Sequence, residues 1–296
     1  MKTFEFEQLA KGILVFKNVL KDPQHTYDVI KKSQTEPHEL FTEWMDWGIT
    51  GLKTTMDPFD TRDLNNDPGQ LILELKSIFY SCFSIYRNGH VDINYLKSLN
   101  IDPHYRIPAS DEEARNAHGW GSADILIIDY ANSQGNDGFI NGYHTDRTPY
   151  WGGSPHAFTL NIYPNDNFKG GGLYFINMQT QEKKFTDNGN EYYEIDEPIY
   201  YEPKAGEALL FPSDQYHGVS QVYDGEKLFI RMFMESPRSN DWPDMIKGMT
   251  QEEIKIKTQE AREQVFKDYA HEAAIWKSTR DIDNSRIDKS RKFIIR

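Results

Sequence analysis

The stretch HAFTLNIYPNDNFKGGGLYF, residues 156–175, combines an apolar strand, a polar turn, a glycine run and a second apolar strand. Similar short runs lie on both sides of it: DILIIDY (124–130), KFTDN with YYEI (184–195), EALLF (207–211), HGVSQVY (217–223) and KLFIRMFM (227–234). Several short strands separated by turn residues at this spacing are typical of a β-sandwich or barrel. We therefore predict a mainly β, jelly-roll core over residues 120–237 with flanking helices.

Outside this core the chain carries helix signals. ILVFKNVL (13–20) indicates one strand, and Asp22-Pro23 and Asp67-Pro68 each indicate a helix start. The second helix places five apolar residues on one face, namely Leu71, Leu75, Ile78, Cys82 and Ile85. Thr250 and Glu253 form a capping-box pattern before a charged helix to about residue 277. We expect one domain, 1–296, with a helix-rich part at 1–119 and a helical extension at 238–296.

Composition excludes several classes of protein. The 33 Lys and Arg against 46 Asp and Glu give a net charge of -13, which disfavours a nucleic-acid binder. The single cysteine, Cys82, excludes an internal disulfide and cysteine-based zinc sites. We find no signal-peptide run and no apolar stretch of roughly 20 residues, the length that spans a membrane. These features lead us to expect a cytoplasmic protein without a membrane partner.

The residues best suited to chemistry are His144 and Asp146 in GYHTDRTPY. Residues two apart in a strand face the same side, so an imidazole and a carboxylate would project together. They would form two legs of a 2-His-1-carboxylate triad for non-haem Fe(II), with a distant histidine as the third. A second His-x-Asp, His90 and Asp92, follows the long helix, and we interpret it as a helix-to-loop junction.

The order of motifs over residues 120–237 resembles that of the 2-oxoglutarate- and Fe(II)-dependent oxygenases of the prolyl 4-hydroxylase-like group. The motifs are H-x-D, Tyr-x-Asn, Gly-Gly-x-x-x-Phe, a Pro-x-x-Gly turn before a Phe-ending strand, a distal His and a basic residue ten positions later. In this chain they are His144 and Asp146, Tyr163 and Asn165, Gly170 and Gly171 with Phe175, Pro203 and Gly206 with Phe211, His217, and Lys227. The chain departs from the family at Gly172-Leu173, where Glu-Thr is common.

This resemblance implies a double-stranded β-helix (jelly-roll, cupin-like) fold in which His144, Asp146 and His217 hold Fe(II). The far carboxylate of 2-oxoglutarate requires a buried cation and a hydroxyl beside it. Lys227 is the cation by position, Arg231 is the second candidate, and Tyr130 or Tyr163 would supply the hydroxyl.

The direction of Lys227 depends on how the chain turns at Asp224-Gly225. A two-residue hairpin turn would point Lys227 away from His217, whereas a three-residue loop with a glycine bulge would bring both to one side. In the second register Gln221 pairs with Lys227.

The implied activity is hydroxylation of an unactivated C–H bond, with O2 as oxidant and conversion of 2-oxoglutarate to succinate and CO2. Ascorbate is a supporting reductant. The carboxylate of Asp146 favours hydroxylation or desaturation over halogenation. A prolyl residue in a peptide or protein and a free amino acid both remain open as substrates, as does the oligomeric state. The alternative is a non-catalytic or differently metallated cupin-type binding protein. The histidines at 25, 38, 90, 104, 118, 156 and 271 are expected to be surface or capping residues.

Overall fold

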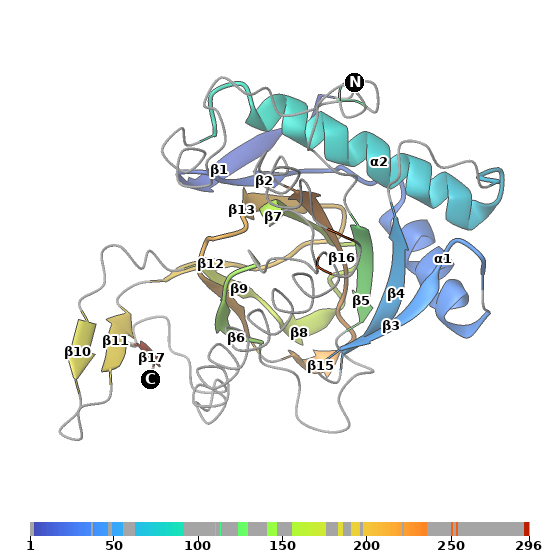
Figure 1. Ribbon diagram of the computed structural model, residues 1–296. Coiled ribbons are helices and arrows are strands. Elements are labelled where there is room, and N and C mark those ends of the chain that lie inside the picture. Colours follow the sequence, from blue (N-terminus) through green and yellow to red (C-terminus); the bar gives the residue numbers. More distant parts are fainter. Residues whose placement is uncertain are drawn as a thin grey trace.

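The structure is a computed structural model, and it describes residues 3–36, 38–46, 49–55, 63–91, 110, 113, 124–129, 141–146, 156–175, 183–185, 191–195, 198–220, 222–235, 250, 253 and 293–295. Within these residues the chain forms two helices and a set of antiparallel strands (Figure 1).

The major sheet has eight strands. In spatial order they are β1 (Phe6–Ala10), β2 (Ile13–Phe16), β13 (Ala208–Pro212), β7 (His156–Ile162), β16 (Leu228–Glu235), β5 (Asp124–Asp129), β4 (Ile49–Thr55) and β3 (Thr42–Asp46). The minor sheet is β12 (Ile199–Tyr201), β9 (Leu173–Phe175), β14 (His217–Val219) and β6 (Asn141–His144). Two layers of antiparallel strands connected by crossovers make up the expected double-stranded β-helix.

Two small sheets complete the described strands. β8 (Phe168–Gly170) pairs with β15 (Val222–Gly225). β11 (Glu191–Ile195) pairs with β10 (Lys183–Phe185) on one side and with β17 (Phe293–Ile295) on the other.

Both predicted helices are present, and both have side-chain caps. Helix α1 (Pro23–Thr35) begins after Asp22, whose carboxylate accepts a hydrogen bond from the His25 backbone N–H at 2.9 Å. Helix α2 (Asp67–Tyr86) is capped one residue earlier than expected, by Asn66, which accepts from the Gly69 N–H at 2.8 Å. Proline in the first turn costs no intrahelical hydrogen bond, because that N–H has no partner there. No helix in the described part of the chain is long and apolar enough to cross a membrane.

We expected the first third of the chain to be mostly helical. This prediction is wrong in one respect, because four strands of the major sheet lie there. β1 pairs with β2, while β3 and β4 extend the opposite side of the sheet from β5. The sequences of β3 and β4, TEWMD and ITGLKTT, mix polar residues and glycine with few apolar residues. Strands at the margin of a sheet need little apolar alternation, so their signal is weak.

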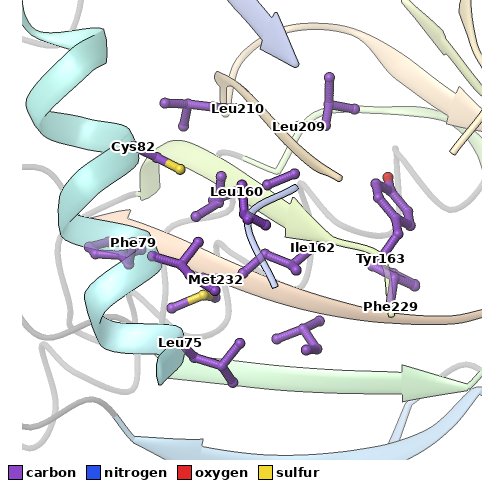
Figure 2. Close-up of a cluster of buried hydrophobic side chains, with 14 of the residues drawn as sticks. Leu75, Phe79, Cys82, Leu160, Ile162, Tyr163, Leu209, Leu210, Phe229 and Met232 are labelled. Atoms are coloured by element: carbon purple, nitrogen blue, oxygen red, sulfur yellow. The ribbon is translucent and has the colours of Figure 1, made fainter. Parts of the chain in front are cut away.

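Part of the apolar core lies between α2 and one face of the major sheet. Leu160 of β7 and Met232 of β16 point toward Leu75 and Phe79 of α2, and all four are nearly inaccessible to water (Figure 2). Cys82 lies in the same layer, where burial raises the pKa of its thiol well above the ordinary value. Of the predicted apolar face of α2, only Ile85 is not fully buried, and it packs against the cluster.

Neither of the hairpins considered for residues 222–227 forms. β15 pairs with β8, with Val222 opposite Gly170 and Gly225 opposite Phe168, while β16 pairs with β5 and β7. The chain therefore passes from one sheet to another at Glu226 and Lys227. Local turn chemistry at Asp224-Gly225 predicted the hairpin, but pairing with a strand distant in sequence prevailed.

Near the C-terminus, the capping box is confirmed by its hydrogen bonds. The Thr250 N–H donates to Oε2 of Glu253 at 2.7 Å, and the Glu253 N–H donates to Oγ1 of Thr250 at 3.3 Å. The rest of the helix predicted after Thr250 lies outside the described residues.

Candidate active site

The face of the major sheet opposite α2 carries the polar residues of the site. Across strands β13, β7 and β16, one row contains Phe211, Thr159 and Phe233, and the next contains Leu209, Asn161 and Arg231. Neighbours along each strand, such as Leu160 and Met232, face α2 instead. Because side chains alternate in a strand, the residues of these two rows point toward the minor sheet.

His217, the distal histidine of the predicted metal triad, is the first residue of β14 in the minor sheet. Its Cα lies opposite His144 of β6 on one side and opposite Phe175 of β9 on the other. The His217 ring is 4.8 Å from the ring of Phe211 and 6.0 Å from that of Phe175, measured between centroids. The two phenylalanines of the sequence pattern thus pack against the distal histidine.

The orientation of His217 is set by its backbone partner. Nδ1 lies 2.8 Å from the carbonyl oxygen of Gln215, and Nε2 lies 3.6 Å from Oδ2 of Asp146. A histidine that donates from Nδ1 to a carbonyl presents the lone pair of Nε2, the form that binds metals. His217 is 3% exposed and Asp146 is 7% exposed, so the pair is shielded from bulk water.

Asp146 is held by partners from the major sheet. Its backbone N–H donates to the Ser213 carbonyl at 2.7 Å, and Oδ2 accepts from Oγ1 of Thr159 at 2.9 Å. The Thr159 and Ser213 hydroxyls are also 2.9 Å apart. One residue of β7 and the residue that follows β13 therefore fix the carboxylate and the backbone of the aspartate.

The structure thus brings Asp146 and His217 together, and it places the backbone of His144 opposite His217. The side chain of His144 lies outside the described part of the structure. Among the described side chains, no group of three His, Cys, Asp or Glu is arranged to hold a metal ion.

A cation and a second histidine also lie beside Asp146. Nη1 of Arg231 is 3.6 Å from Oδ1 of Asp146, and its guanidinium carbon is 4.9 Å from the ring centroid of Phe233. On that ring stacks His156, with centroids 3.9 Å apart, and Nδ1 of His156 lies 3.2 Å from the Asp146 carbonyl oxygen. The expectation that His156 is a surface or capping residue is therefore wrong.

Lys227 lies in an apolar enclosure. It is 1% exposed, and its Nζ donates to the carbonyl oxygen of Gly171. The same Nζ is 5.5 Å from the ring centroid of Tyr163, 5.3 Å from that of Phe229 and 6.0 Å from that of Phe168. Burial disfavours the charged amine and lowers the pKa of Lys227 to about 7.

Of the two tyrosines that could supply the hydroxyl, the structure describes one. Tyr163 is fully buried beside Lys227, with its ring 6.2 Å from that of Phe229. Tyr130 lies outside the described residues.

The glycine run leaves room for the lysine. Gly171 has φ +70°, and a Cβ there would lie 2.9 Å from Cδ of Lys227 and 2.9 Å from Cγ2 of Val222. At Gly172, where the family commonly has Glu, a Cβ would lie 2.3 Å from the ring of Tyr200. The departure from the family pattern therefore accompanies a tyrosine that covers this position.

Comparison with known proteins agrees with the family resemblance inferred from the motifs. Residues 128–235 match the family model of the 2OG-Fe(II) oxygenase superfamily. No curated protein matches the chain.

Several solved structures are similar in fold at low identity. A prolyl-4-hydroxylase from Pseudomonas putida is 14% identical with a TM-score of 0.41, covering 78% of this chain and 95% of its own. A prolyl hydroxylase from Trichoplax adhaerens, solved in complex with a hypoxia inducible factor oxygen degradation domain peptide fragment, is 15% identical with a TM-score of 0.44, covering 76% and 84%. A Phytophthora capsici prolyl 4-hydroxylase is 15% identical with a TM-score of 0.44, covering 78% and 60%.

Proposed function

We propose that the protein is a 2-oxoglutarate- and Fe(II)-dependent oxygenase and that His144, Asp146 and His217 hold its iron; the match of residues 128–235 to that superfamily supports the proposal. On this proposal the enzyme hydroxylates a C–H bond of its substrate.

The observation that carries the iron assignment is the buried pair of Asp146 and His217. An imidazole nitrogen and a carboxylate oxygen face each other at 3.6 Å, and the strand pairing sets the backbone of a second histidine opposite the first. Two imidazoles and one carboxylate are the donors that non-haem Fe(II) takes in such enzymes. The donor set therefore fits Fe(II).

Lys227 is the proposed anchor for the far carboxylate of 2-oxoglutarate, with Tyr163 beside it. A desolvated ammonium group is stabilised by a carboxylate placed within the same enclosure, because Coulomb attraction is strong where water is excluded. Arg231 is the weaker candidate for this carboxylate, since its guanidinium lies next to Asp146. We assign Arg231 to the metal end of the proposed site.

When bound, iron with 2-oxoglutarate and O2 supplies the oxidant: one oxygen atom enters the succinate that forms with CO2, and the other enters the product. The chain's own contribution is to orient and to exclude water. Thr159 holds the carboxylate of Asp146, and Gln215 sets the ring of His217. The aromatic rings around Lys227 keep water from the anchored carboxylate.

For the substrate, we propose a peptide or protein, with a prolyl residue as the first choice. The motif set of the prolyl 4-hydroxylase-like group supports this choice, and a free amino acid is the alternative. We also propose that the protein acts in the cytoplasm, as the sequence led us to expect.

The test is a succinate-release screen with Fe(II), 2-oxoglutarate, O2 and ascorbate against proline-containing peptides and free amino acids. Iron-dependent succinate formation that increases with one substrate class supports the proposal and identifies that class. A cupin-type binding protein would release no succinate with any of them, and that result would overturn the oxygenase mechanism. Asp146→Ala serves as the matched inactive control.

A further inference from the structure

This inference rests on the proposed role of Lys227 as the 2-oxoglutarate anchor. Lys227 and Glu226 lie between β15 and β16, where the chain leaves one sheet and enters another. A long side chain emerging from such a crossing points in a defined direction only if the backbone there is held.

The side chain of Asn165 holds this backbone on both sides of the lysine. Its Oδ1 accepts a hydrogen bond from the Leu228 N–H at 3.0 Å, and its Nδ2 donates to the Glu226 carbonyl at 2.5 Å. A carboxamide has one donor group and one acceptor on the same short side chain, so it can satisfy an N–H and a C=O at once. Asn165 itself is 8% exposed, so water competes little for these bonds.

The neighbours of Lys227 explain why this hold sets its direction. Leu228 is buried in the apolar core, and Glu226 pairs with Lys31 of α1 on the outer side. Because successive side chains in an extended chain point to opposite sides, Lys227 is directed inward, along Gly171 and toward Phe229.

We propose that Asn165 is a positioning residue that fixes the backbone around Lys227 and thereby aims its ammonium group at the far carboxylate of 2-oxoglutarate. This positioning role is distinct from merely stabilising the loop between β7 and β8, in which Asn165 lies. Asn165 also donates to Oδ1 of the exposed Asn167 at 2.6 Å, and that bond lies within the loop without touching the residues around Lys227. Asn167→Ala is therefore the matched control.

The experiment measures the dissociation constants of Mn(II) and 2-oxoglutarate by calorimetry on the full chain. Asn165→Ala should raise the dissociation constant of 2-oxoglutarate about tenfold, as expected for the loss of two hydrogen bonds to the backbone. The dissociation constant of Mn(II) should not change, because the hydrogen bonds of Asn165 are to residues beside Lys227 and in its own loop, not to Asp146 or His217. Asn167→Ala should leave both constants unchanged.

Coupling to Lys227 separates positioning from general damage. In a Lys227→Met background, Asn165→Ala should cause no further loss of 2-oxoglutarate affinity, since the group it aims is gone. A further tenfold loss of 2-oxoglutarate affinity in that background would mean that Asn165 acts independently of Lys227, and it would overturn the inference.

Other outcomes are equally decisive. Normal 2-oxoglutarate binding by Asn165→Ala, beside weakened binding by Lys227→Met, would reject Asn165 and leave the anchor intact. Normal binding by Lys227→Met would reject the anchor itself, a failure of the proposed function. If Asn165→Ala does not fold, Asn165→Ser is measured in the same way, with thermal unfolding recorded for each variant. A lower unfolding temperature with unchanged affinity would assign Asn165 a purely structural role.

Discussion

The two ends of the proposed active site hold charged groups by opposite means. At the metal end, the carboxylate of Asp146 receives a hydrogen bond from Thr159 and lies 3.6 Å from the Arg231 guanidinium. At the cosubstrate end, the ammonium of Lys227 lies among three aromatic rings and a carbonyl oxygen. The first end is built from directed polar partners, and the second from exclusion of water. The first arrangement orients the carboxylate that we propose as a metal ligand, whereas the second would increase the free energy gained from pairing with an anion.

The largest effect is expected at the metal end, from Asp146→Ala. It removes the oxygen ligand, so metal binding and iron-dependent succinate formation should both be lost. The fold should persist, because Asp146 lies among polar partners rather than in the apolar layer beneath α2. Mn(II) calorimetry and circular dichroism measure the two properties. Succinate formation by a folded Asp146→Ala protein would remove Asp146 from the metal site.

At the cosubstrate end, Lys227→Met should weaken 2-oxoglutarate binding by about 2–5 kcal/mol, because a buried carboxylate loses its paired charge. Metal binding should be retained, since the metal ligands are untouched. Lys227→Arg should rescue only in part, because a planar guanidinium does not fit the space of an ammonium group. The matched control is Arg231→Met. Should that variant lose 2-oxoglutarate affinity while Lys227→Met keeps it, the anchor is Arg231.

A smaller effect is expected from Thr159→Val, which removes the hydroxyl that holds Asp146. Loss of such an outer hydrogen bond typically lowers metal affinity by about 10–100-fold, because the ligand is less well oriented. Thr54→Val is a matched control: that threonine is also buried, and its hydroxyl has no hydrogen-bond partner among the described residues. Equal metal affinities for the two valine variants would show that Thr159 does not orient Asp146.

The smallest expected effect is a pH dependence confined to the cosubstrate end. Burial lowers the pKa of Lys227 to about 7, so the free site loses its positive charge as pH rises above that value. The 2-oxoglutarate affinity should then fall about tenfold per pH unit above pH 7, up to the higher pKa that the ion-paired lysine has in the complex. Titration calorimetry at pH 6.5, 7.5 and 8.5 tests this prediction. Repeating it in at least two buffers measures the proton uptake on binding, which should be about one proton per ligand at the highest pH. Lys227→Arg should abolish the dependence.

The same shift acts on stability with the opposite sign. Between pH 7 and 10.5 the unfolded chain binds a proton at Lys227 that the folded free protein does not. Stability of the free protein should therefore rise with pH in this window through Lys227, while 2-oxoglutarate affinity falls. A parallel fall of both quantities would contradict the lowered pKa.

The sequence predicted those parts of the site that repeat with the period of a strand. His217, Phe175 and Phe211, which the motif pattern singled out, lie together. Lys227 and Arg231 both lie on the inner face, although neither hairpin considered for residues 222–227 forms. These positions were predictable because strand alternation and the spacing of motifs are local properties of the chain.

What the sequence left out depends on partners far away in the chain. Thr159 is an ordinary polar residue of β7 and Ser213 lies directly after β13, and only the pairing of β7 with β13 brings their hydroxyls together beside Asp146. His156 lacks any nearby motif and reaches the site by stacking on Phe233. The hairpin at 224–225 failed for the same reason, because β8 outcompeted the local turn.

Cys82 lies in the layer between α2 and the major sheet, on the face opposite Thr159 and Arg231. A buried thiol of raised pKa reacts with an alkylating reagent only after that layer opens. Because the chain has no other cysteine, its labelling rate is a single-site readout of how often the helix separates from the sheet. Ligands that bind the closed molecule reduce the population of such open states. Slower alkylation of the one thiol behind the sheet would therefore report that a ligand is bound at the proposed site on the other face.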